Sequence, residues 1–241
     1  GLPLQTVESF NDTIDKAIAL DTDRIVTFSY AHVPSIIERQ KVLEKIGFPS
    51  LKDKAKMYQN AYDKFTEAGY VAIGMDHFAK PHDEFAIALE NKNLHRNFQG
   101  YCTLETTGQV YAFGASSISQ LDSAYIQNIK NASQYINSIE KNNLAVLRGY
   151  SVTKEQKIIR EIINSIMCNY FVDINLISKK YNLTNSELYN SIQFKEDSLE
   201  DFILDKILDF DDNKININES GRLFTRNIAM RFDPLIDQKI G

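Results

Sequence analysis

The segment between Gly69 and Pro81 constrains the fold more than any other part of the sequence. Residues 70–75 are apolar and partly β-branched and follow a glycine, so they predict a short buried strand. Ionisable and aromatic residues follow at once, and Pro81 rules out simple continuation of the strand. Parallel α/β layers present active sites in this way, at the carboxyl ends of their strands. A solvated loop with a capping aspartate is an equally weighted alternative.

Helical spacing alternates with a second predicted strand at residues 24–30. Thr6 is a suitable N-cap for the first helix, and the right-handed crossover rule makes strands 24–30 and 70–75 parallel. Their carboxyl ends would then place residues 30–32 beside residues 76–78. The further helices are predicted over residues 36–46, 51–68 and 83–89.

The remainder of the chain is predicted to be mainly helical. Residues 94–102 and 107–113 read as the two strands of a hairpin, and residues 114–120 as a small-residue turn that either approaches a ligand or enters a helix. Thr153 and Gln156 have the spacing of a capping box. The later helices are predicted over residues 129–141, 174–181, 185–191, 199–208 and 220–230, with a hairpin at 210–217.

Composition excludes several classes of protein. The 241 residues carry a formal net charge of −5, so no overall basic field favours nucleic acid. No apolar run approaches the roughly 18 residues of a membrane helix, and we expect no membrane association. The two cysteines, Cys102 and Cys168, have no Cys-x-x-Cys spacing, which favours a reduced, cytoplasmic protein.

Four strings of residues resemble one known family. They are Tyr-Ala-His-Val-Pro from Tyr30, Gly-Met-Asp-His-Phe-Ala-Lys-Pro from Gly74, His-Arg-Asn-Phe-Gln-Gly-Tyr from His95 and Gly-Ala-Ser-Ser-Ile-Ser from Gly114. The family is that of the oxygen-independent coproporphyrinogen III oxidases, radical S-adenosylmethionine enzymes of haem biosynthesis. The resemblance covers essentially the whole chain, and the third string separates these enzymes from their haem-chaperone relatives.

This resemblance implies an α/β fold in two domains. Residues 1–127 would form the last strands of a partial (β/α) radical S-adenosylmethionine barrel, and residues 128–241 a mostly helical, winged-helix-like domain. The family holds a 4Fe–4S cluster through Cys-x-x-x-Cys-x-x-Cys, a spacing that Cys102 and Cys168 cannot supply. We therefore expect a C-terminal fragment with no metal ligands and no catalytic residue of its own, which is inactive alone.

The reaction implied for the complete enzyme is the oxidative decarboxylation of two propionates of coproporphyrinogen III to vinyl groups. At matching positions, Ala31 and Ile118 would contact S-adenosylmethionine, and Gln99 would lie near a second S-adenosylmethionine and the substrate. The three residues are therefore expected to converge on one concave face. The substrate carries four carboxylates, so cationic partners are expected, and His77, Lys80 and Arg96 are the candidates. Ordinary surface ion pairs are the competing interpretation for Lys80 and Arg96.

Two other functions are alternatives. Three helices and a hairpin resemble a winged helix, but acidic residues at the hairpin tip, such as Asp211, would repel nucleic acid phosphates. Haem binding or trafficking by a relative of the enzyme is the other alternative, through the histidines. The complete enzyme is expected to be a monomer. In the fragment, we expect the apolar strand 24–30 either to pair with another copy of the chain or to be covered by the chain's own N-terminal segment.

Overall fold

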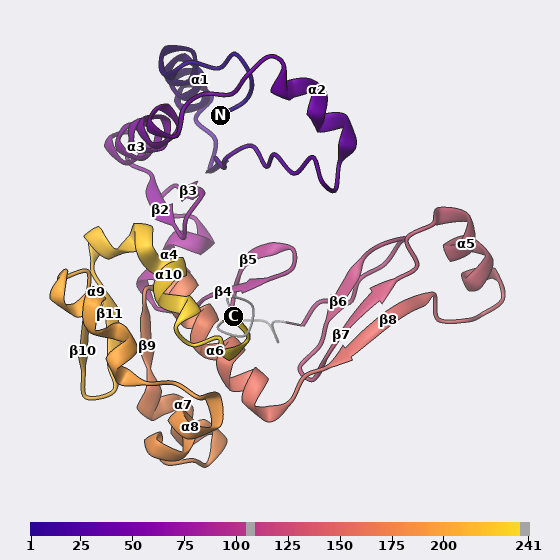
Figure 1. The fold of residues 1–241 in the computed structure, drawn as a ribbon, viewed down its shortest axis with the longest axis vertical. Helices are drawn as coiled ribbons and strands as arrows, with labels where there is room; N and C mark the ends of the chain where they lie inside the picture. Colours follow the sequence, from indigo (N-terminus) through magenta and orange to yellow (C-terminus); the bar gives the residue numbers. More distant parts are fainter. Residues whose placement is uncertain (105–108, 237–241) are drawn as a thin grey trace. The chain divides into compact units, whose positions relative to one another are not determined.

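The computed structural model describes residues 1–104 and 109–236, and its elements are shown in Figure 1. The chain forms two compact units, Gly1–Ile87 and Ala88–Gly241. The domain boundary expected between residues 127 and 128 stays a prediction. None of the helices in the described residues combines the length and apolar character needed to cross a membrane.

Two long helices organise the first unit. Helix α1 (Val7–Ala19) begins at Thr6, whose hydroxyl accepts a hydrogen bond from the Ser9 amide, and helix α3 (Leu51–Glu67) is capped in the same way by Ser50. Both caps satisfy amides that a helix start leaves without partners. The apolar faces of the two helices meet and enclose a core, so the predicted helices are confirmed here. The buried members of this core are Ile14, Ala61, Phe65, Tyr70, Ala72 and Phe78.

The sheet of the first unit differs from the expected pair of neighbouring parallel strands. Strands β1 (Arg24–Val26) and β2 (Val71–Ile73) run in the same direction, but β3 (His77–Ala79) lies between them, antiparallel to both. Gly74 has φ of +60°, a conformation that favours glycine, and it starts the tight turn from β2 into β3. Residues 77–79 are therefore a strand and not a loop.

Two further expectations for the first unit were too long. The strand predicted at residues 24–30 ends at Val26, and the residues that follow are irregular. In place of a helix over residues 36–46 there is a 3₁₀ turn, η1 (Glu38–Gln40), followed by the short helix α2 (Lys41–Glu44). Neither helical segment buries a side chain, so packing does not extend them.

The second unit begins within helix α4 (Glu84–Glu90) and continues into a tight hairpin. Strands β4 (Leu94–Asn97) and β5 (Gly100–Thr103) pair with two residues between them, so the single strand expected at 94–102 is wrong. The Asn97 side chain accepts a hydrogen bond from the Gln99 amide at 2.8 Å, and Gly100 has φ of +132°. An Asx turn followed by glycine reverses the chain at this point. Part of the partner strand expected at 107–113 lies outside the described residues.

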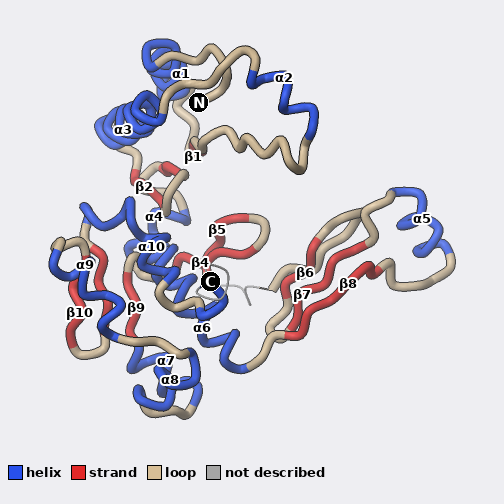
Figure 2. The backbone as a smooth tube through the Cα atoms, viewed as in Figure 1, coloured by secondary structure: helices blue, strands red, loops and turns tan. Residues whose placement is uncertain are grey.

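The second unit also contains a three-stranded antiparallel sheet that was not predicted. It consists of β6 (Ile118–Gln120), β7 (Ala124–Asn128) and β8 (Val146–Ser151), in that order, as the red strands of Figure 2 show. Helix α5 (Ala132–Glu140) connects β7 to β8 and is shorter than the expected helix over 129–141. Every residue of β8 is exposed, so it lacks the apolar alternation by which a strand is recognised in sequence.

The last part of the chain packs around helix α6 (Lys154–Asn169). Its N-terminus has the predicted capping box between Thr153 and Gln156, and Ile158, Ile162 and Ile166 are at most 1% exposed. The three-stranded sheet beside it has the order β10-β11-β9. The remaining elements are β9 (Phe171–Asp173), α7 (Ile174–Tyr181), α8 (Asn185–Ile192), η2 (Glu196–Leu199), α9 (Glu200–Leu204), β10 (Leu208–Asp211), β11 (Lys214–Ile217), η3 (Glu219–Phe224) and α10 (Thr225–Met230).

Most expectations for this region are confirmed, with two differences. Helices α7 and α8 match their predictions, and the β10–β11 hairpin turns at Asp212 and Asn213, both with positive φ, as in a type I′ turn. The helix expected over 199–208 stops at Leu204, because β10 uses Leu208 to pair with Ile217. The helix expected over 220–230 consists of η3 and α10.

Candidate functional site

In the first unit, Ala31 lies in the irregular segment that follows β1. Gln40 fixes the backbone of this segment from both sides: its side-chain nitrogen donates to the Ala31 carbonyl at 2.9 Å, and its oxygen accepts from the Val33 amide at 2.6 Å. Ala31 is exposed. A small exposed side chain on a fixed backbone can lie against a flat ring.

Next to Ala31, three aromatic rings stiffen the same segment. The Phe48 ring lies 4.6 Å from the His32 ring and 5.8 Å from the Tyr30 ring, measured between centroids. Nε2 of His32 is 3.0 Å from Glu44 Oε1, so the ring is held at its edge as well as at its face. These contacts keep the backbone around Ala31 in place without a regular element.

His77 and Lys80 are brought to opposite ends of strand β3. His77 pairs with Val26 at the carboxyl end of β1, and its Nδ1 is 2.7 Å from Asp76 Oδ1. The backbone amide of Lys80, in contrast, donates to the Asp23 carbonyl at the start of β1. The reversal at Gly74 therefore places Lys80 at the start of β1, whereas His77 lies at the carboxyl end of β1.

Lys80 is also engaged with its own neighbours. Its Nζ lies 2.8 Å from Asp21 Oδ1 and 4.3 Å from the centroid of the Tyr70 ring. The hydrogen bond to Asp21 raises the pKa of Lys80 above its ordinary value. A substrate carboxylate at Lys80 would therefore compete with an existing ion pair.

In the second unit, Arg96 and Gln99 lie on the β4–β5 hairpin. Gln99 occupies its two-residue turn and is exposed. The guanidinium of Arg96 lies 5.6 Å from the ring of Tyr101, the residue paired with Arg96 across the hairpin. The backbone carbonyl of Arg96 accepts a long hydrogen bond, 3.4 Å, from the Asn164 side chain. The structure therefore brings these two predicted site residues onto one short element, both available to a ligand.

Ile118 opens strand β6 directly after the small-residue segment. Gly114 and Ser116 both have positive φ, and the Asn128 side chain donates to the Gly114 carbonyl and to the Ser117 hydroxyl, each at 3.1 Å. The segment is a turn into a strand and not into a helix. Ile118 itself is half-buried and pairs with Gln127.

The expected convergence of Ala31, Gln99 and Ile118 stays a prediction. Ala31 belongs to the first unit, and Gln99 and Ile118 belong to the second. The same division separates His77 and Lys80 from Arg96.

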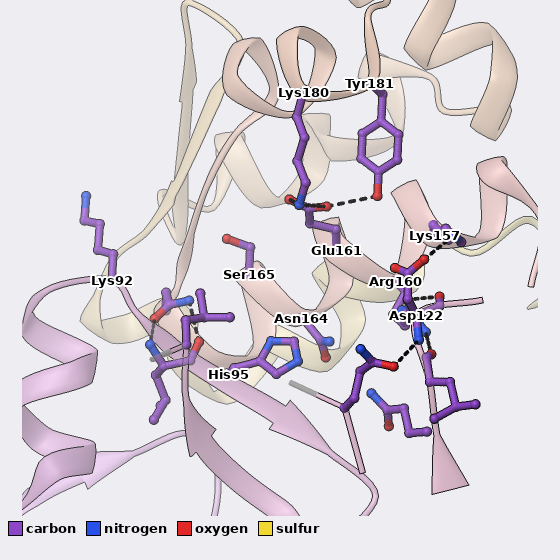
Figure 3. A pocket seen from close by; sticks show the side chains of 16 residues that line it. Lys92, His95, Asp122, Lys157, Arg160, Glu161, Asn164, Ser165, Lys180 and Tyr181 are labelled. Carbon is purple, nitrogen blue, oxygen red and sulfur yellow. Dashed lines mark hydrogen bonds and ion pairs between the residues drawn. The ribbon is translucent and has the colours of Figure 1, made fainter. Parts of the chain in front are cut away.

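A cavity in the second unit was not anticipated. It has a volume of about 520 Å³ and lies between β4, α6 and the loop after β6 (Figure 3). Helix α6 lines it with residues at helical spacing, among them Lys157, Arg160, Glu161 and Asn164, and the ring of His95 points into it from β4. That spacing is visible in the sequence, but the residues that face the helix are far from it in the chain, and Leu94 contacts Asn169 across 75 positions.

Ion pairs and burial set the electrostatics of this cavity. Lys157 is 2.6 Å from Asp122, and the hydrogen bond between them holds the pKa of Asp122 below its usual range. Lys180 is 2.8 Å from Glu161. Burial, reinforced by the charge of Arg160, lowers the pKa of His95, so its imidazole is neutral near pH 7.

The cysteines do not fit an iron–sulfur cluster. Cys168 is fully buried in α6, and burial raises the pKa of its thiol to about 12. Burial also raises the pKa of the half-buried Cys102. Cluster ligation needs thiolates, and within the described residues no group of three or more His, Cys, Asp or Glu side chains is placed to hold a metal ion.

Comparison with known proteins identifies the family. No protein-family model matches the chain. The oxygen-independent coproporphyrinogen III oxidase of Thermostichus vulcanus is 37% identical over 242 residues, which cover all of this chain and 73% of that protein. The chain belongs to the oxygen-independent coproporphyrinogen III oxidase family.

Other members of the family match over the same extent of this chain. The oxygen-independent coproporphyrinogen III oxidases of Escherichia coli and Salmonella typhimurium are 38% and 36% identical over 241 residues, 99% of this chain. The match covers 51% of each of those proteins, so the chain spans about half the length of these relatives.

A solved structure agrees with the fold. It is described as coproporphyrinogen III oxidase (HemN) from Escherichia coli, a radical SAM enzyme. It matches with a TM-score of 0.90 and 36% identity, over 98% of this chain and 53% of the solved one. The α/β class predicted from the sequence is confirmed.

Proposed function

We propose that the protein containing this chain is an anaerobic coproporphyrinogen III dehydrogenase. It converts two propionate side chains of coproporphyrinogen III to vinyl groups by oxidative decarboxylation and gives protoporphyrinogen IX. The observation that carries the proposal is the family match, which runs through the whole chain and includes the β4–β5 hairpin. This hairpin presents an arginine and a glutamine on one short element, which suits an acidic substrate and a polar cofactor.

The cofactor contacts proposed in this chain are with S-adenosylmethionine. Ala31 offers a small exposed surface on a fixed backbone, Gln99 an exposed amide that can donate and accept, and Ile118 an aliphatic contact. S-adenosylmethionine and a 4Fe–4S cluster supply the radical chemistry in the proposed reaction. Because the described residues do not fit the cluster, we assign its ligands to a part of the protein outside these 241 residues.

The substrate contact that the geometry favours is Arg96. Its side chain is exposed, and a guanidinium binds a propionate through two parallel hydrogen bonds. His77 remains a candidate, with its Nδ1 engaged by Asp76. Lys80 contributes only if the substrate replaces Asp21 at its ammonium group.

The finer description of the fold is also proposed. Residues 1–127 are assigned to a partial radical S-adenosylmethionine barrel and residues 128–241 to a winged-helix-like domain, in which α6, α7 and α8 accompany the β10–β11 hairpin. The tip of that hairpin contains Asp211 and Asp212 and would repel nucleic acid. We assign the complete protein no nucleic-acid partner and a monomeric state.

The test uses the complete protein with its cluster reconstituted under anaerobic conditions. Loss of coproporphyrinogen III and appearance of the divinyl product are followed by fluorescence after oxidation to the porphyrins. Arg96→Gln is expected to raise KM about tenfold or more, because the neutral amide cannot replace the charged, two-hydrogen-bond contact of the guanidinium. Arg39→Gln, an exposed arginine in η1, is the matched control. Absence of product from the parent enzyme would overturn the proposal, and equal KM values for the two variants would remove Arg96 from it.

A further inference from the structure

The cavity beside α6 has a lining with excess positive charge. Among the described residues, four lysines and arginines and two carboxylates line it, in a chain whose formal net charge is −5. Lys157 and Lys180 are paired with these two carboxylates, Asp122 and Glu161. The remaining two cations, Arg160 and Lys92, therefore carry the excess.

Arg160 makes its hydrogen bonds to neutral acceptors. It donates to the carbonyls of Leu121 and Asp122 at 3.4 and 2.8 Å, and to the Tyr125 hydroxyl at 3.2 Å. Lys92 lies 3.6 Å from the centroid of the Phe171 ring. Neither cation is ion-paired with a carboxylate in the described part of the chain. Their charge is fixed in place but not neutralised.

His95 adds a polar ring that can form a hydrogen bond with a ligand. Its ring enters the cavity from β4 and makes no hydrogen bond with the described residues (Figure 3). The charged groups that act on it are Arg160, Glu161 and Lys180. An anion in the cavity would offset the two cations and give the ring a hydrogen-bond acceptor.

We propose that this cavity binds the carboxylate or phosphate group of a small molecule, held by Arg160 and His95 with Asn164 beside them. Charge-assisted hydrogen bonds to an oxyanion are about twice as strong as neutral ones. The volume of about 520 Å³ has room for a metabolite-sized ligand.

This site is separate from the contact proposed for the substrate. His95 pairs across the hairpin with Cys102, whereas Arg96 pairs with Tyr101. Successive side chains of a strand point to opposite faces, so His95 and Arg96 face different ligands. The inference therefore goes beyond the proposed function and does not depend on it.

The four histidines provide a direct test in the 241-residue chain. Their ring Cε1–H signals are followed by ¹H–¹³C NMR during titration with succinate and, separately, with inorganic phosphate, at constant ionic strength. The expected result is a saturable shift of His95 with at least one anion and an increase in its pKa. His82, whose side chain is 75% exposed, is the internal control for non-specific effects. The probe with the lower midpoint identifies the preferred class of anion.

Variants test whether the shift of the His95 signal reports binding in the cavity. Arg160→Gln is expected to weaken binding about tenfold or more, as the loss of one charge-assisted hydrogen bond implies. Because Arg160 also holds the loop after β6, Lys157→Gln provides a second, milder reduction of positive charge. Lys179→Gln, an exposed lysine of α7, is the matched control and should leave the midpoint unchanged. The proposal is overturned if neither anion gives a saturable shift of His95 at tens of millimolar. It is also overturned if Arg160→Gln and Lys157→Gln both retain the parent's midpoint.

Discussion

The side chain of Asn169 pairs with the backbone of Leu94 as a neighbouring strand would. Its nitrogen donates to the Leu94 carbonyl at 2.9 Å, and its oxygen accepts from the Leu94 amide at 3.0 Å. The last residue of helix α6 thereby holds the first residue of β4. Both His95 and Arg96 depend on this attachment for their position.

Replacing Asn169 should therefore destabilise the second unit. Asn169→Ala removes two hydrogen bonds and leaves two backbone groups of Leu94 without partners, at a cost of about 2–4 kcal/mol. Urea unfolding followed by circular dichroism measures this change. Asn190→Ala, at an exposed position of α8, is the control. A loss no larger than that of the control would show that Asn169 does not hold the strand.

The stability of the chain should depend on pH through His95. Its pKa is lowered in the folded state, mainly by burial and then by Arg160, so the unfolded chain binds more protons as pH falls through about 6.5. The native state therefore loses stability on acidification through this window and retains it above. Urea unfolding at about pH 5.5 and 7.5, in a buffer without carboxylate or phosphate, should show a smaller difference for His95→Gln than for the parent. An unchanged difference would contradict this assignment.

The two thiols should differ in reactivity. With a pKa of about 12, roughly one Cys168 thiol in ten thousand is ionised at pH 8, and the side chain is fully buried as well. Cys102 is half-buried and its pKa is raised by burial alone. Iodoacetamide should therefore modify Cys102 first, with both cysteines modified in urea, as peptide mass spectrometry can show. Equal rates in the native protein would contradict the structure.

The exposed apolar side chains near β1 should promote self-association. β1 lies at one edge of its three-stranded sheet, with Val26 47% exposed and Phe28 77% exposed just beyond it. An open apolar edge is a template for pairing with another chain. Light scattering over a concentration series should show association of the 241-residue chain and its reduction in Phe28→Lys.

The control for this experiment is Phe113→Lys, since Phe113 is 89% exposed and lies outside that sheet. Equal reduction by the two substitutions would indicate general surface hydrophobicity rather than the strand edge. A parent that stays monomeric at high concentration would exclude the association altogether.

The features that could be predicted from the sequence are those encoded by residues close together in the chain. The capping box between Thr153 and Gln156 is encoded within four residues, and it was predicted. The reversal at Gly74 was not, because residues 77–79 form a strand only through pairing with β1 and β2 on its two sides. Strand β8 was missed because its residues are exposed and its pairing with β7 is non-local.

The same distinction applies to the site. Arg96 and Gln99 lie three positions apart in one string of residues, so both were named from the sequence, although the hairpin turn between them was not predicted. The cavity around His95 joins residues from Lys92 to Tyr181, and its character depends on which cations are already paired. Pairing of this kind is decided by tertiary contacts and leaves no short motif.

The turn at Gly74 couples the chemistry of the first unit to its packing. His77 and Phe78 are adjacent on β3, so one faces Asp76 and the other is 2% exposed in the helical core. Removing or adding one residue in the turn would shift the register and exchange the two faces of the strand. The imidazole would enter the core and the phenyl ring would leave it. The length of this turn therefore sets both the position of a candidate site residue and the stability of the helices behind it.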